Sequence, residues 1–164
     1  MMFNEGIVLG HLISGDGIKV DSSKVEVISK LSVPNCQWDV RIFLGFTGYY
    51  RRFIEKFTKI SSPLFKLLTK ECEFSWNSDC QAAFETLKKR ISEVPILKGP
   101  NSNFPFHKSI DASDTTLGAV LRKKDFTPYE IYYTSKNLIP MELNYVVMEK
   151  EFLVVVNSIH KSRY

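Results

Sequence analysis

The chain has 164 residues and a formal net charge of +4 at pH 7, with 44% hydrophobic and 24% charged residues. This balance is typical of a folded globular protein of one ordinary domain or two small ones, and it excludes a disordered chain. No apolar run exceeds about five residues, and no basic-then-apolar leader opens the sequence. We therefore expect an intracellular protein with no membrane contact, in the cytoplasm or the nucleus.

The cysteines agree with this expectation. Cys36, Cys72 and Cys80 are an odd number without paired spacing. They indicate reduced thiols rather than a disulfide framework or a zinc site.

In chain order, the first expected element is a hairpin. Residues 6–21 read GIVLGHLISGDGIKVD, two strand-like runs around Gly15 and Gly17, which suit a tight turn. Helical patterns then predict helices over residues 22–33, 39–60, 61–70 and 74–94. Pro34 closes the first of these helices, and Pro63 lies in the first turn of the third.

The helix expected over 39–60 carries an aromatic stripe. Its large apolar side chains recur every three or four residues, at Phe43, Phe46, Tyr50, Phe53, Phe57 and Ile60. Such a stripe usually packs into a core, and we interpret it so rather than as a base-stacking surface.

Positive charge gathers in the same part of the chain. Between residues 41 and 70, seven Lys or Arg side chains accompany a single acid, Glu55. A surface of this kind suits phosphate groups, and Arg51, Arg52, Lys56 and Lys59 are the candidate nucleic-acid contacts. A solvated basic helix face explains the charge equally well.

The second part of the chain has a different character. Residues 97–104, LKGPNSNF, are typical of a linker and suggest a domain boundary. Three β-rich runs follow, at residues 104–113, 115–124 and 128–138, and then a helix over 141–164 that is apolar nearly all round. The fold class is therefore α+β, helices first and then three strands and a helix packed on them.

Five blocks of sequence resemble the Pol polyprotein of gypsy-class LTR retrotransposons, in the family's order. They are VLGHLISGDGIKVDSSKVEVI, VRIFLGFTGYYRRFIEKFTKISSPLFKLL, FSWNSDCQAAFETLKKRI, IDASDTTLGAVL and YTSKNLIPMELNYVVMEKEFLVVV. The resemblance implies the end of a reverse transcriptase palm at residues 1–21 and thumb and connection helices at 22–98. It implies the N-terminal part of an RNase H-like domain at 99–164, with three antiparallel strands, a helix and a truncated end.

The resemblance also implies a metal site. Asp111 matches the family's carboxylate on the first strand, and Glu151 matches its carboxylate on the first helix, where they hold catalytic Mg²⁺ or Mn²⁺. Residue patterns alone leave other roles open. Asp111 could accept hydrogen bonds in a turn, Glu151 could be an exposed helix acid, and the helix pattern does not separate Glu151 from Glu149.

Two departures from the family limit what the chain can do by itself. No Asp-Asp pair of the polymerase site occurs, and the later RNase H aspartates are absent. Arg122 also stands where the family commonly has glutamine, which puts local substrate contacts in doubt.

Three interpretations remain open. The chain is a fragment of a reverse transcriptase/ribonuclease H, inactive alone and binding metal weakly; a non-catalytic nucleic-acid-binding module; or an idle remnant. The implied partners are an RNA–DNA hybrid or template–primer duplex and the remaining Pol segments. We also expect exposed apolar surface in the C-terminal part, because a helix over 143–160 normally packs under a larger sheet than three strands.

Overall fold

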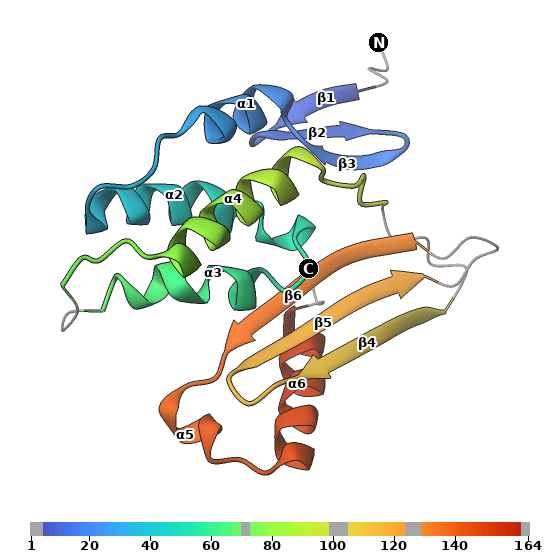
Figure 1. The fold of residues 1–164 in the computed structure, drawn as a ribbon. Coiled ribbons are helices and arrows are strands. Elements are labelled where there is room, and N and C mark those ends of the chain that lie inside the picture. The colour runs from blue at the N-terminus through green and yellow to red at the C-terminus, as the bar shows by residue number, and fades with distance from the viewer. Residues whose placement is uncertain (1–4, 70–72, 99–104, 124–128, 162–164) are drawn as a thin grey trace.

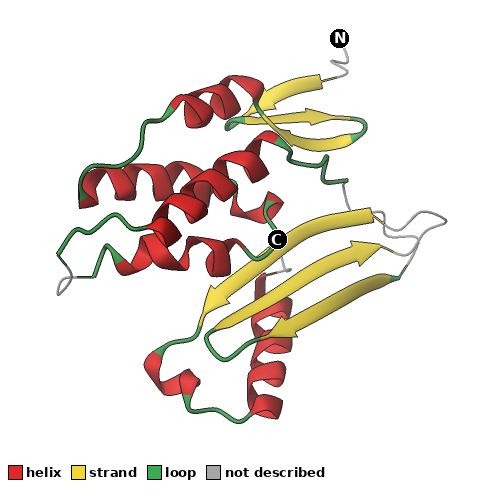
Figure 2. Cartoon of the chain, in the orientation of Figure 1, coloured by secondary structure: helices red, strands yellow, loops and turns green. Residues whose placement is uncertain are grey.

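A computed structural model describes residues 5–69, 73–98, 105–123 and 129–161. Two three-stranded antiparallel sheets are separated along the chain by a group of helices (Figures 1 and 2). The first region contains β1 (Glu5–Val8), β2 (His11–Ser14), β3 (Gly17–Val20), α1 (Ser22–Lys30), α2 (Gln37–Tyr49), the 3-10 helix η1 (Arg51–Phe53), α3 (Phe57–Lys66) and α4 (Ser78–Ser92). The second contains β4 (Phe106–Ala112), β5 (Thr116–Lys123), β6 (Tyr129–Asn137), α5 (Pro140–Leu143) and α6 (Val147–Lys161). The α+β class and the order of elements are confirmed.

The first sheet is tied to the segment that follows α4. Ile18 and Leu97 exchange two backbone hydrogen bonds, with N···O distances of 2.8 and 3.0 Å. Next to them, Gly17 has a φ of 137°. A Cβ at this position would collide with the carbonyl oxygen of Leu97, so only glycine allows the two segments to approach this closely.

The helices of the first region enclose one hydrophobic core. Phe43 and Phe84 pack with ring centroids 4.6 Å apart, between α2 and α4. The aromatic stripe lies in this core as expected at four of its residues: Phe43, Tyr50, Phe53 and Phe57 are buried. Phe46 differs, because 42% of its surface is exposed.

The prediction of one continuous helix over residues 39–60 is wrong. Helix α2 ends at Tyr49, η1 follows, and Lys56 adopts a left-handed backbone with a φ of 55° before α3 begins. Phe43 of α2 and Phe57 of α3 are buried in the same core, so the hydrophobic spacing continues across a break that it cannot detect. The segment between the two helices, residues 50–56, contains no glycine or proline, although Gly48 lies in the last turn of α2.

The helix expected to start at residue 61 is the second half of α3. Pro63 lies inside this helix rather than in its first turn. Because proline has no backbone N–H, one helical hydrogen bond is lost there. Nearby, the hydroxyl of Ser61 donates to the carbonyl of Phe57 at 2.7 Å, within a buried part of the helix.

The second sheet has the strand order β4-β5-β6 and two distinct faces. Ala112 pairs with Leu117, and these residues pack with Val154 of α6. Neighbouring residues of a strand point to opposite faces, so Asp111, paired with Gly118, belongs to the other face. Figure 1 shows α6 lying against one side of this sheet, with the helical region beside β6.

Helix α6 is less buried than its composition suggests. Lys150, Val154 and Ser158 are its buried residues, whereas Met148 and Phe152 are 79% and 70% exposed. The expected burial against a sheet therefore holds for one narrow face, and the expected exposed apolar surface is confirmed.

The prediction of one continuous helix over residues 141–164 is also wrong. Helix α5 ends at Leu143, and a new helix starts at Val147. The Glu149 carboxylate accepts a hydrogen bond from the Val146 N–H at 3.0 Å, which stabilises this second start. Residues 162–164 lie outside the described part of the chain.

Two further expectations concern the redox state and the membrane. Cys36 and Cys80 are free thiols, and Cys72 lies outside the described residues. Across the described ranges, no helix has the length and apolar character needed to cross a bilayer.

Candidate nucleic-acid interface and carboxylate residues

Asp111 lies near the end of β4 on the sheet face opposite α6. Its Oδ2 is 3.3 Å from Nζ of Lys56, and the two side chains are 67% and 51% exposed. Lys56 reaches it from the left-handed turn between η1 and α3. The structure thus brings together two of the predicted site residues, one from each region. An ion pair this exposed contributes little to stability.

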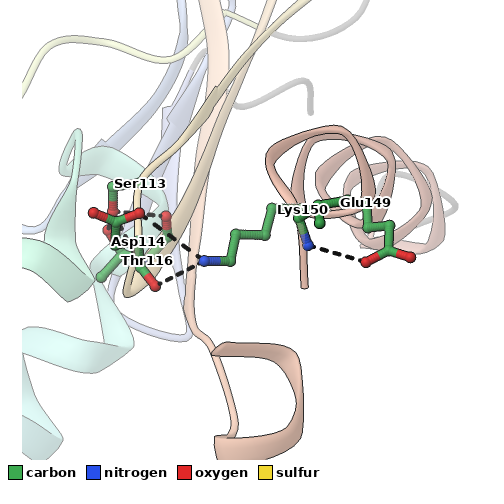
Figure 3. A network of polar contacts seen from close by, with 6 residues as sticks. Ser113, Asp114, Thr116, Glu149 and Lys150 are labelled. Atoms are coloured by element: carbon green, nitrogen blue, oxygen red, sulfur yellow. Dashed lines mark hydrogen bonds and ion pairs between the residues drawn. The ribbon is translucent and has the colours of Figure 1, made fainter. Parts of the chain in front are cut away.

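Glu151 and Glu149 are both exposed on α6 but point in different directions. At about 100° per residue, Glu151 lies about 60° round the helix from Val154, which faces the sheet, and Glu149 about 140° from it. Glu149 also caps the start of the helix. Figure 3 shows its side chain directed away from the sheet, while Lys150 extends towards the β4–β5 turn. Glu151 therefore lies nearer than Glu149 to the side of α6 that faces the sheet.

Lys150 is the polar link between α6 and the β4–β5 turn. Its Nζ lies 3.4 Å from the Asp114 carbonyl oxygen and 4.0 Å from Asp114 Oδ1 (Figure 3). In the same turn, Ser113 and Thr116 exchange hydrogen bonds through their hydroxyls and backbone groups. This network holds the turn that follows Asp111 against the helix that carries Glu151.

The carboxylates do not by themselves form a metal centre. Within the described ranges, no three His, Cys, Asp or Glu side chains gather closely enough to hold an ion. Asp111 points to the face opposite α6 and meets Lys56 there. Two carboxylates are too few by themselves for a catalytic divalent metal, which needs several oxygen ligands around it.

The four predicted basic residues have separate roles. Arg51 donates a hydrogen bond to the Ser135 carbonyl of β6, and burial lowers the pKa of its guanidinium. Lys56 pairs with Asp111, whereas Arg52 and Lys59 are exposed. Arg51 therefore joins the two regions, and Arg52 and Lys59 remain open to solvent.

Ser135 completes this junction. Its hydroxyl is 2.6 Å from Oγ1 of Thr58 and accepts a hydrogen bond from the Thr58 N–H at 3.2 Å. Both residues are buried. The helical region thus contacts β6 at Ser135 through both the side chain and the backbone N–H of Thr58.

A cleft of about 1080 Å³ lies between the two regions. Basic side chains line it from distant parts of the sequence: Arg51, Arg52, Lys98, Lys108 and Lys161. The last three were not predicted, because each is an isolated lysine in the sequence and only the tertiary fold brings them together.

Comparison with known proteins places the chain in a family. Residues 76–164 match the RNase H-like domain found in reverse transcriptase. The match covers more than half of the chain, which therefore belongs to this family. It begins upstream of the boundary expected at residue 99 and includes α4.

The curated relatives are polyproteins of transposons. The chain is 38% identical over 153 residues to the retrovirus-related Pol polyprotein from transposon 297 of Drosophila melanogaster, covering 93% of this chain and 14% of that protein. It is 34% identical over 172 residues to the Pol polyprotein from transposon gypsy of the same organism, covering 97% and 16%. The Tf2-3 polyprotein of Schizosaccharomyces pombe is 32% identical over 162 residues, covering 95% and 12%. The gypsy-class resemblance is confirmed, and the chain spans about one-seventh of the length of these relatives.

Solved structures share the fold at low sequence identity. The foamy viral protease-reverse transcriptase in complex with an RNA/DNA hybrid aligns over 97% of this chain and 22% of that one, with a TM-score of 0.81 and 21% identity. The same enzyme in complex with dsDNA aligns over 99% and 34%, with a TM-score of 0.80 and 21% identity. The likeness covers both regions of the chain.

Proposed function

We propose that the chain is the part of a retroelement reverse transcriptase/ribonuclease H that holds the RNA–DNA hybrid or template–primer duplex. The parent protein would carry out RNA-directed DNA synthesis and hydrolysis of the RNA strand in hybrids. The observation that carries this proposal is the 38% identity to a Pol polyprotein over 93% of the chain. The nucleic-acid complexes of the foamy viral enzyme, which has the same fold, support it.

The proposed division of labour follows the resemblance. Residues 1–21 would end the palm, residues 22–98 would form the thumb and connection, and residues 99–164 would begin the RNase H-like domain. The exposed Arg52 and Lys59 would contact phosphates, while Arg51 bonds to the Ser135 carbonyl across the two regions and Lys56 pairs with Asp111. The other Pol segments are the expected protein partners, inside the cell, in the cytoplasm or the nucleus.

We propose Asp111 and Glu151 as the carboxylates that this chain contributes to a divalent-metal site of the parent protein. Mg²⁺ or Mn²⁺ would need further oxygen ligands besides these two. The chain alone should therefore bind metal weakly and leave a labelled RNA–DNA hybrid uncut with either ion. Cleavage that disappears in Asp111→Asn would contradict this expectation.

Binding of a fluorescein-labelled RNA–DNA hybrid, measured by anisotropy, tests the proposed function. Arg52→Ala/Lys59→Ala should weaken binding about tenfold or more, because two phosphate contacts are lost. The matched control is Lys30→Ala/Lys89→Ala, which removes the same charge from lysines paired with Glu26 and Glu93. No binding by the unmodified chain would favour the idle remnant. An unchanged affinity in the first variant would overturn the roles proposed for Arg52 and Lys59.

A further inference from the structure

The cleft between the two regions has an unusual charge. Its five basic side chains come from η1, the segment after α4, β4 and the end of α6. Among the described residues that line it there is no aspartate or glutamate. A concave surface lined by one sign of charge concentrates the field and attracts anions.

Two lysines of the cleft, Lys108 and Lys161, are partly shielded from water. Burial lowers the pKa of Lys108 below its ordinary value. Burial also lowers the pKa of Lys161, and the positive charges of Arg51 and Lys136 lower it further. An ammonium group in such surroundings is stabilised by an approaching anion, which replaces lost hydration and offsets the repulsion.

The remaining walls suit a polymer better than a small ion. Tyr49, Tyr132 and Tyr133 line the cleft together with aliphatic side chains. A volume of about 1080 Å³ is far larger than a single phosphate requires. Aromatic rings beside several cations fit a chain in which phosphates alternate with sugars and bases.

We propose that this cleft binds the phosphodiester backbone of one nucleic-acid strand, with Lys98, Lys108 and Lys161 on consecutive phosphates and Arg52 at the rim. Arg51 is a positioning residue, because its bond to the Ser135 carbonyl fixes the two walls relative to each other. The inference rests on the proposed function, since it takes nucleic acid to be the polyanion.

Lysine acetylation tests the cleft without an amino-acid substitution. The full chain would be labelled with and without an RNA–DNA hybrid, and the modified lysines would be quantified by mass spectrometry. We expect the hybrid to reduce labelling of Lys98, Lys108 and Lys161 at least threefold. Lys30, Lys66 and Lys89 are exposed outside the cleft and should keep their labelling. Equal protection of both groups would overturn the proposal.

A charge-matched pair of triple variants gives the second test. Lys98→Gln/Lys108→Gln/Lys161→Gln should weaken hybrid binding by about tenfold or more and lower the salt slope of log K by about 2 to 3. Lys30→Gln/Lys66→Gln/Lys89→Gln should change the slope by less than about 1. Circular dichroism and thermal melting would confirm that both variants fold.

Different experimental outcomes would overturn the cleft proposal and the proposed function. If the hybrid binds and only Arg52→Ala/Lys59→Ala weakens it, the cleft proposal is overturned and the proposed function stands. If no hybrid binds, the proposed function is overturned, and inorganic tripolyphosphate becomes the probe. Protection of the three cleft lysines by tripolyphosphate would still support an anion-binding cleft, and no protection would overturn it.

Discussion

At the scale of single residues, the structure separates side chains that hold the fold from side chains that remain available. Position 17 requires glycine, because its φ is positive and an added Cβ would meet the carbonyl of Leu97. Asp111 is the opposite case, because its ion pair with Lys56 is exposed. A charged residue with little structural role near the end of a strand is a candidate for function.

Asp111→Asn should change the free energy of unfolding by less than about 1 kcal/mol, since exposed ion pairs contribute little. Urea denaturation followed by circular dichroism measures this. Glu26→Gln, which breaks the exposed pair with Lys30, provides a comparison of the same kind. A loss above about 2 kcal/mol would show that Asp111 is a structural residue.

Gly17→Ala should destabilise the protein by about 2 kcal/mol or more, because the added Cβ meets the Leu97 carbonyl and the φ of 137° becomes strained. Gly15→Ala is the control, since nothing lies within 4 Å of a Cβ there. Thermal melting of the two variants would compare them. Equal melting temperatures would contradict the close packing of β3 against Leu97.

At the scale of elements, the strands were predicted well and the helix breaks were not. Strand-like runs at 104–113, 115–124 and 128–138 enclose β4, β5 and β6 within two residues at each end. Turn residues flank these strands and mark their limits. The breaks around Lys56 and Val146 carry no such mark, because they depend on tertiary packing and on the Glu149 cap.

The connection from β6 into α5 depends on one carboxylate. Glu142 accepts hydrogen bonds from Lys136 Nζ at 2.7 Å and from the Ile139 N–H at 3.0 Å, and these lower its pKa. A carboxyl group whose pKa is lowered in the folded state stabilises the protein at pH values above the pKa that it has in the unfolded chain, about 4.3. That contribution is lost as the pH falls through the folded pKa.

Stability should therefore fall below about pH 4.5, and Glu142→Gln should make this fall shallower. Urea midpoints measured between about pH 3 and pH 7 would test it. Glu85→Gln, on the exposed side of α4, is a suitable control. An identical pH dependence in Glu142→Gln and the unmodified chain would show that the Lys136 contact does not persist in solution.

At the scale of the whole molecule, two regions meet through contacts between residues distant in sequence. Arg51 bonds to Ser135, and Lys56 pairs with Asp111. The sequence predicted the basic residues 51–59 from their local density. It could not predict Lys98, Lys108 or Lys161 as part of one surface, since their proximity arises only when the sheet docks on the helices.

The salt dependence of hybrid binding tests the central claim most directly. If the chain holds nucleic acid through phosphate contacts at Arg52, Lys59 and the cleft lysines, log K should fall linearly with log salt, with a slope of about −3 to −5. Anisotropy of a labelled hybrid between about 50 and 200 mM salt would give this slope. A slope near zero, or no binding at the lowest salt, would contradict the account.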